Sequence, residues 1–164
     1  MMPNKIRTSL STVWEGEAIV LRDGDTVIDR ISGPEIHRVI LVSDRGDTPT
    51  DLSFAIVETA TDHVVLPAET GIAGRVHFEH QKFWRERSCV YWVSNSSAAL
   101  PRHLRPGVWL LRRNRPAYIR IPIGELAPTL AQWPLEGPQS WEQRKWARIL
   151  ASRSLPAPGE RAPK

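Results

Sequence analysis

Short apolar runs separated by turn-forming residues dominate the first hundred positions. Residues 18–22 and 26–31 are two such runs, and Asp23-Gly24-Asp25 lies between them. This pattern predicts a β-hairpin, because glycine accepts the positive φ angle that a tight turn requires. The longer apolar run at 36–43 predicts a central strand that is covered on both faces.

A second hairpin is predicted from residues 53–59 and 63–67, which flank Thr61-Asp62. Its second strand is expected to stop at Pro67, or to lie at a sheet edge, because proline has no N–H to donate. An approximate 3.6-residue period then predicts a helix over 71–86, followed by a short aromatic strand over 88–93.

The pattern changes after residue 97. Residues 108–113 and 117–121 predict two more strands about Asn114. In the second of these, the alternation places Ile119 and Ile121 on one face and Tyr118 and Arg120 on the other. A short helix is expected between positions 124 and 133, with a new turn starting at Pro128.

The best-defined helix is the last one. Ser140 and Gln143 match a capping box at its start. At about 100° per residue, one broad face carries the apolar positions Trp141, Trp146, Ile149 and Leu150. Arg144 and Arg148 lie together on the opposite face.

These elements predict an α+β fold: an antiparallel β-meander of about five to seven strands with one packed helix, then a β-hairpin and a C-terminal amphipathic helix. We expect a flexible N-terminus over 1–11, a single domain over 12–152 and a disordered tail over 153–164. The loop at 94–100 is the natural place for a boundary within the domain.

Composition narrows the class of protein. The 164 residues suffice for one domain with its own core. Cys89 is the only cysteine, which excludes an internal disulfide and a cysteine-rich zinc site. The N-terminus has no apolar run of signal-peptide length, and no window reaches the length of a membrane span. We therefore expect a soluble, cytoplasmic protein without membrane association.

Charge is distributed unevenly along the chain. Residues 1–96 hold 10 Lys and Arg against 14 Asp and Glu, a net charge of −4, whereas residues 97–164 hold 12 against 4, a net charge of +8. A basic half of this kind can contact nucleic acid, an acidic partner or the acidic half of its own chain.

The basic second part also contains aromatic residues, and interleaved cations and aromatics can bind phosphates and stack on bases. The candidate set for binding nucleic acid or another anion is Arg105, Trp109, Arg112, Arg113, Tyr118, Arg120, Arg144 and Arg148. An ordinary solvated surface, or pairing with the acidic half, explains the same residues without a partner.

A metal site is the sharpest alternative. His77 and His80 lie three residues apart and would share one face of the predicted helix, and Cys89 follows in the next strand. Zinc needs at least one ligand besides the two histidines, for which Cys89, His63 or Glu79 are candidates. Cys89 can also be considered as a nucleophile. The competing explanations are two surface histidines on an amphipathic helix and a buried structural cysteine.

The order of elements also suggests a family. Residues 51–57 form a strand with an Asp-x-x-Phe start, residues 63–67 form a strand ending in Pro67, and a helix and the aromatic strand Val90-Tyr91-Trp92 follow. Residues 15–93 in this respect resemble a group of small uncharacterised bacterial proteins, and they are similar to pleckstrin-homology-like domains. The resemblance implies a β-meander plus helix and carries over neither a ligand site nor an activity. This chain departs from that group by adding about 70 residues beyond Val93, which the smaller proteins lack.

These observations favour a non-enzymatic bacterial accessory or binding module that acts through protein–protein contacts and uses no cofactor. A nucleic-acid-binding protein that uses the arginine-rich second part is the alternative. A metal- or cysteine-dependent hydrolase is the third hypothesis. The partner and the oligomeric state are left open by the sequence.

Overall fold

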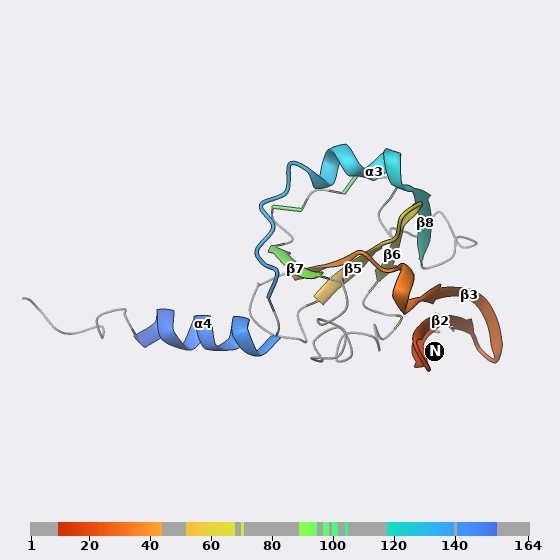
Figure 1. Ribbon diagram of the computed structural model, residues 1–164, viewed down its shortest axis with the longest axis horizontal. Helices are drawn as coiled ribbons and strands as arrows, with labels where there is room; N and C mark the ends of the chain where they lie inside the picture. Colours follow the sequence, from red (N-terminus) through yellow and green to blue (C-terminus); the bar gives the residue numbers. More distant parts are fainter. Residues whose placement is uncertain are drawn as a thin grey trace, which may run out of the picture.

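The fold is built from two β-sheets with helices beside them, as a computed structural model shows (Figure 1). The structure describes residues 10–43, 52–67, 70, 89–94, 97–98, 100–101, 104, 118–139 and 141–153. The predicted helix at 71–86, the predicted strand at 108–113 and the Ser140 cap lie outside these residues. The α+β class is confirmed.

The first sheet, sheet A, is an antiparallel meander of three strands: β1 (Leu10–Glu15), β2 (Ala18–Asp23) and β3 (Thr26–Ser32). Gly16 and Gly24 have φ angles of 61° and 59° in the two connecting turns, a conformation that glycine adopts without a steric cost. The predicted hairpin about Asp23-Gly24-Asp25 is confirmed.

The second sheet, sheet B, contains β4 (Arg38–Ser43), β5 (Leu52–Glu58), β6 (Asp62–Pro67), β7 (Cys89–Ser94) and β8 (Ile119–Pro122). Its spatial order is β7-β4-β5-β6-β8. All neighbours are antiparallel except β4 and β7, which are parallel. The strands are therefore divided between two sheets, where the sequence pattern suggested one continuous meander.

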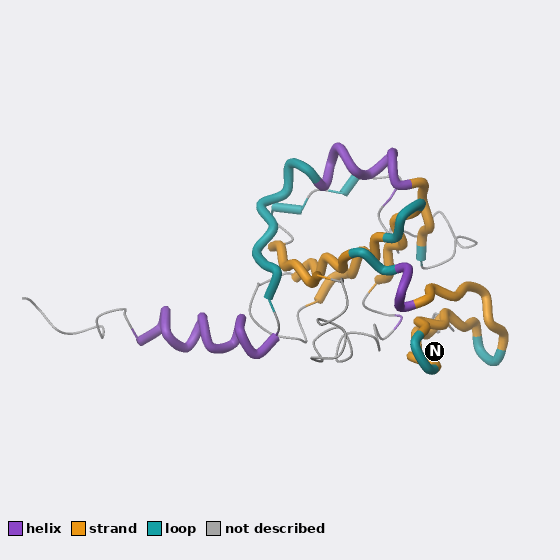
Figure 2. Tube along the Cα trace, viewed as in Figure 1, coloured by secondary structure: helices purple, strands orange, loops and turns teal. Residues whose placement is uncertain are grey.

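Sheet B is buried on both faces. Alternate residues of β4 point to opposite sides, so Val39 and Leu41 join one buried cluster while Ile40 and Val42 join the other. The first cluster lies between the sheets and includes Ile19, Leu21 and Ile31 of sheet A. The second lies beneath α3 (Ile123–Leu130) and includes Leu126, Leu130 and Trp133 (Figure 2). The prediction of a central strand at 36–43, covered on both faces, is confirmed.

Helix α3 contains Pro128 and continues through it to Leu130. The expectation of a new turn at this proline is wrong. A proline at this position removes one intrahelical hydrogen bond, and burial of Leu126 and Leu130 against sheet B offsets that loss.

The segment 135–139, which we call the strap, pairs with the outer edge of β7. The backbone N–H of Trp92 donates to the Glu136 carbonyl (2.8 Å), the Glu136 N–H donates to the Trp92 carbonyl (2.7 Å), and the Gln139 N–H donates to the Val90 carbonyl (3.1 Å). Gly137 has a φ angle of 132°, and a Cβ there would lie 2.9 Å from the Val90 carbonyl oxygen. Glycine therefore allows the strap to approach β7 closely and cover an otherwise open sheet edge.

Helix α4 (Trp141–Arg153) begins two residues after the end of the strap and projects away from both sheets (Figure 1). It occupies the stretch where the sequence predicts the last helix. Within the described residues, no helix is both long enough and apolar enough to cross a lipid bilayer.

Candidate functional site

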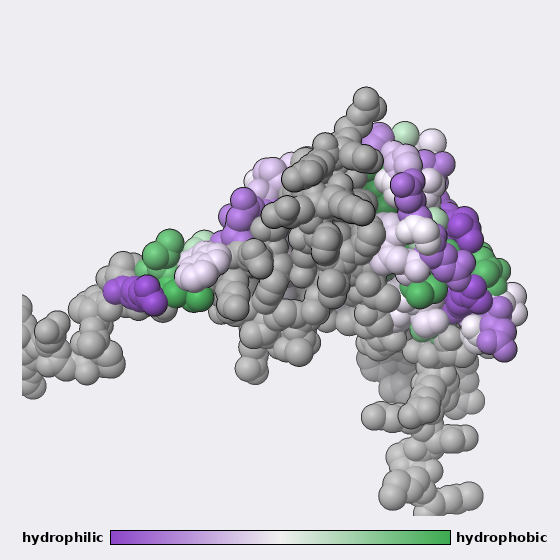
Figure 3. Space-filling model, turned by 60° about the horizontal axis from the view of Figure 1, so that its bottom comes forward, coloured by the Kyte–Doolittle hydropathy of each residue, from purple (hydrophilic) through white to green (hydrophobic). Residues whose placement is uncertain are grey.

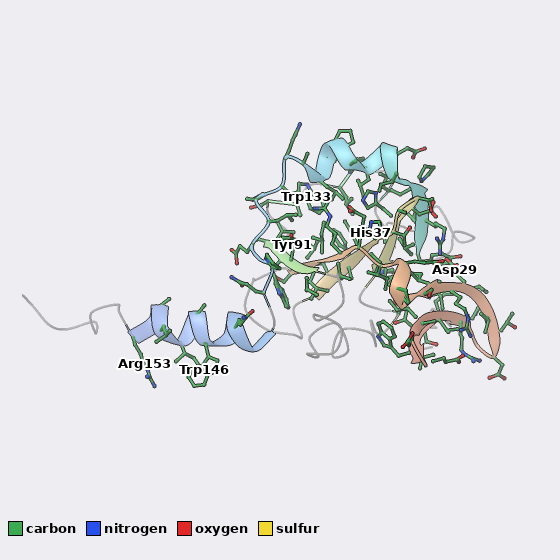
Figure 4. The ribbon with its side chains drawn as sticks, viewed as in Figure 1. Asp29, His37, Tyr91, Trp133, Trp146 and Arg153 are labelled. Atoms are coloured by element: carbon green, nitrogen blue, oxygen red, sulfur yellow. The ribbon has the colours of Figure 1, made fainter. Side chains whose placement is uncertain are left out.

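The most exposed large apolar side chains of the described residues lie on α4. Trp146 is 58% exposed and Leu150 is 62% exposed. They are four residues apart, so they lie one helical turn apart on the same side. Arg153 points to the same side as Trp146 (Figure 4). We call residues 141–153 the α4 arm.

The position of the arm follows from the strap. Three backbone hydrogen bonds tie Glu136 and Gln139 to β7, and the arm starts two residues after Gln139. Among the described side chains of the arm, Trp146, Ile149 and Leu150 belong to neither buried cluster of the body. Its sequence holds Arg144, Lys145, Arg148 and Arg153 against one acidic residue, Glu142. The arm thus combines an exposed apolar pair with a net positive charge.

A row of polar side chains crosses sheet B, and its histidine is fully buried. Arg38, Glu58 and His63 lie opposite one another on the adjacent strands β4, β5 and β6, and we call them the polar row. The Glu58 Oε2 atom is 2.8 Å from Arg38 Nε and 2.8 Å from His63 Nε2. Because an ionised carboxylate can only accept, His63 donates from Nε2.

The environment of the row shifts the pKa of Glu58. Desolvation is the largest influence and raises it, but hydrogen bonds from His63 and Arg38 together with their charges bring the pKa of Glu58 below 4.5. The His63 side chain is 0% exposed, and its Nδ1 makes no hydrogen bond with the described residues. A dissolved substrate cannot reach a fully buried imidazole, so the contact that His63 makes here is the structural one with Glu58.

A third feature joins the two sheets. Arg120 on β8 donates to both carboxylate oxygens of Asp29 on β3, from Nε and Nη2 at 3.0 Å each, and from Nη1 to Asp62 on β6 at 3.1 Å. The hydrogen bonds with Asp29 are the main cause that raises the pKa of Arg120. Burial, followed by the charge of Asp29, raises the pKa of the neighbouring Tyr118. Arg120, Asp29 and Asp62 form an ion-pair clamp between sheet A and sheet B.

The residues of the predicted metal site are placed only in part. His77, His80 and Glu79 lie outside the described residues, so the metal and cysteine-hydrolase hypotheses stay predictions. Cys89 is on β7, where its backbone lies opposite Arg38 of β4. His63 is three strand spacings away, roughly 14 Å along the row, and it bonds to Glu58. The structure therefore does not bring Cys89 and His63 together. No group of three or more potential metal ligands occurs within the part of the chain that the structure describes.

The predicted anion-binding set is also placed in part. Arg105, Trp109, Arg112 and Arg113 lie outside the described residues. Arg144 and Arg148 belong to α4, and their side chains are not among those described. Tyr118 packs against the core between the sheets, and Arg120 belongs to the clamp. Arg120 thus pairs with the acidic half of its own chain. A phosphate could bind this arginine only by displacing the carboxylates of Asp29 and Asp62.

Sequence reasoning did not single out Glu58 or Asp29. A signal for Glu58 was present, because Glu58 and His63 flank the predicted turn at Thr61-Asp62 and antiparallel pairing places them opposite each other. No comparable local signal connects Asp29 with Arg120, which is 91 positions away.

Comparisons of the chain with protein-family models, with curated proteins and with solved structures found no match.

Proposed function

We propose that this chain is a non-enzymatic protein-binding module in which the two sheets are a rigid support and the α4 arm makes the contact with the partner. The observation that carries the proposal is the exposure of Trp146 and Leu150, one turn apart, on a helix that projects from the body. The strap, which is tied to β7, sets where the arm begins.

Apolar surface that is exposed to water carries a free-energy cost. Burying a side chain of this size contributes about 1.5–3 kcal/mol relative to leaving it in water. A helix that presents apolar residues at positions i and i+4 is the usual form in which a helix enters a hydrophobic groove of another protein. Tryptophan is also among the residues that most often dominate the energy of protein interfaces.

Site-specific photo-cross-linking in the source cells tests this function. A photoreactive residue replaces exposed Gln143 on the arm, and a matched variant carries it at exposed Glu125 on α3. The expected result is a protein that is cross-linked from position 143 and not from position 125. That protein, once purified, should bind the wild-type chain and bind about tenfold or more weakly after Trp146→Ala with Leu150→Ala.

The control substitution is Ala151→Ser, which introduces a polar residue on the side of α4 away from Trp146. It should leave the binding constant unchanged. Equal cross-linking from both positions, or unchanged binding by the Trp146→Ala and Leu150→Ala variant, would show that the arm is not the contact surface.

A further inference from the structure

The β3 strand lies at an edge of sheet A and carries exposed apolar residues. Val27 is 47% exposed and Ile28 is 39% exposed, and hydrophobic surface is visible beside hydrophilic surface at the end of the molecule that holds the β2–β3 hairpin (Figure 3). The strap covers the edge of β7, but no described segment pairs with the outer edge of β3. An exposed apolar edge of this kind is a template on which another extended chain can pair.

One feature that disturbs this edge is a bulge. Leu21 pairs with Asp29 and Arg22 pairs with Val27, so a register shift leaves Ile28 without a partner on β2. A bulge bends an edge strand and interrupts the regular ladder that a further strand would need. It disturbs β3 only at this point, because the pairs that follow it are in regular register.

A second feature lies directly after the bulge. The backbone N–H of Arg30 donates to the Oδ1 atom of Asp29 over 2.8 Å. Each N–H of an antiparallel strand either joins the ladder with its neighbour or points away from it. Because this N–H donates to a side chain of its own strand, it belongs to the outer edge of β3, where an added strand would have to accept from it.

The carboxylate of Asp29 is held in place by a second donor. Arg120 donates from Nη2 to the same Oδ1 atom and from Nε to Oδ2, at 3.0 Å each. An added strand could reach the Arg30 N–H only after displacing this carboxylate. It would replace a charge-assisted hydrogen bond with a weaker one to a neutral carbonyl, so pairing at this point is unfavourable.

We propose that Asp29 protects the β3 edge: its carboxylate occupies the Arg30 N–H and keeps the β3 strand of a second copy of this chain from extending sheet A. This role is additional to the ion pair that Asp29 makes with Arg120. It does not involve the α4 arm, so the proposed function and this inference are tested separately.

Two substitutions that both break the ion pair between Asp29 and Arg120 test the proposal. Asp29→Ala removes the carboxylate and frees the Arg30 N–H, whereas Arg120→Met leaves the carboxylate beside that N–H. Sedimentation velocity at about 0.5 mM detects even weak millimolar contacts, because they populate a dimer at this concentration. The share of species larger than the monomer should rise several-fold over the wild type in Asp29→Ala and should stay at the wild-type level in Arg120→Met.

A rescue experiment identifies the backbone group that is responsible. Arg30→Pro removes the N–H itself, and proline is accepted on an edge strand where the N–H faces outward. Adding Arg30→Pro to Asp29→Ala should return the larger species to the wild-type share. Adding Arg30→Ala instead is the matched control, because it removes the same side chain but keeps the N–H, and it should leave the association in place. Circular dichroism and thermal melting of each variant check its fold.

Amide hydrogen exchange of the wild-type chain tests the same contact without a substitution. The Arg30 N–H should exchange with solvent more slowly than an amide of an unfolded peptide, and exchange at the unfolded rate would overturn the proposal. So would an Asp29→Ala chain that sediments like the wild type, or an Arg120→Met chain that associates as strongly as Asp29→Ala. Equal association after Arg30→Pro and Arg30→Ala would also reject the N–H as the group that Asp29 protects.

Discussion

Glu58 accepts hydrogen bonds on a single carboxylate oxygen from the strands on both sides of β5. Arg38 donates from β4 and His63 donates from β6. Its side chain is 16% exposed, so part of its hydration is lost. Hydrogen bonds to a charged group make a net contribution of about 1.5–3 kcal/mol each. They therefore outweigh the desolvation that acts against the ionised form, and the pKa of Glu58 falls below 4.5.

This lowered pKa leads to a prediction about acid stability. A carboxyl whose folded-state pKa is depressed contributes stability that is fully present above its unfolded pKa and is lost as pH falls through its folded pKa. The free energy of unfolding should therefore decrease from about pH 5 downward, and Glu58→Gln should make that decrease shallower. Urea unfolding between about pH 3 and pH 7 measures it.

At neutral pH, Glu58→Gln should destabilise the fold by about 1–3 kcal/mol, because Arg38 loses its charged acceptor. Glu125→Gln, at an exposed position on α3, serves as the matched control and should leave both the stability and its pH dependence nearly unchanged. Parallel pH profiles for the wild type and Glu58→Gln would contradict the role assigned to this carboxylate.

At the scale of elements, sheet A is attached to sheet B by an apolar cluster and by the Arg120 clamp. Ile19, Leu21 and Ile31 supply the apolar contribution. Arg120 adds a bidentate pair with Asp29 and a single bond with Asp62. A planar guanidinium with three bonds to two carboxylates fixes the orientation of β3 against β6 and β8 more precisely than apolar packing can.

Replacing this arginine should loosen the attachment of sheet A. We expect Arg120→Met to lower the free energy of unfolding by about 1–2 kcal/mol, a range reduced for the partial exposure of the clamp. Arg30→Met is the matched control, because Arg30 pairs with Glu15 at 3.4 Å at a more exposed position, and it should change stability by less than about 0.5 kcal/mol. Equal effects of the two substitutions in urea unfolding would show that the clamp adds nothing beyond a surface ion pair.

At the scale of the whole molecule, the body and the arm differ in how they are held. Both faces of sheet B are buried, and the strap covers the β7 edge. On the arm, Trp146 and Leu150 are mostly exposed to solvent. We therefore expect the contacts that determine thermal stability to lie in the body, and the proposed binding function assigns the surface of the arm to a partner.

Truncation separates these two contributions. A chain that ends at residue 140 keeps the strap, and its melting temperature should lie within about 3 °C of the full chain. A chain that ends at residue 134 loses the hydrogen bonds of Glu136 and Gln139 to β7, and it should melt at least about 5 °C lower and aggregate more readily. Differential scanning calorimetry distinguishes the two cases. A large loss in the longer truncation would show that the arm supports the body.

The sequence predicted most local elements because local rules govern them. The Asp23-Gly24-Asp25 turn, the hairpin of β5 and β6, and the alternation that sends Ile121 to one face of β8 and Arg120 to the other are all present. Pro128 was misjudged because packing of α3 on sheet B overrides the local preference against proline.

The division into two sheets and the parallel placement of β7 beside β4 could not be read from the pattern. Strand pairing across 40 or more positions depends on which apolar faces pack together, and alternation within a strand carries no information about its neighbour. For the same reason, the clamp of Asp29, Arg120 and Asp62 was not foreseen.

The sequence by itself thus determined the strands and turns, the α+β class, the apolar positions of the last helix and the opposite charges of the two halves. Only the tertiary structure decided where those features lie: His63 fully buried, Arg120 bound to two carboxylates, and Trp146 and Leu150 in solvent. The physical reason is that an apolar residue is attracted to any apolar surface and a charge to any opposite charge. Which surface or charge each one meets is fixed only when the whole chain packs.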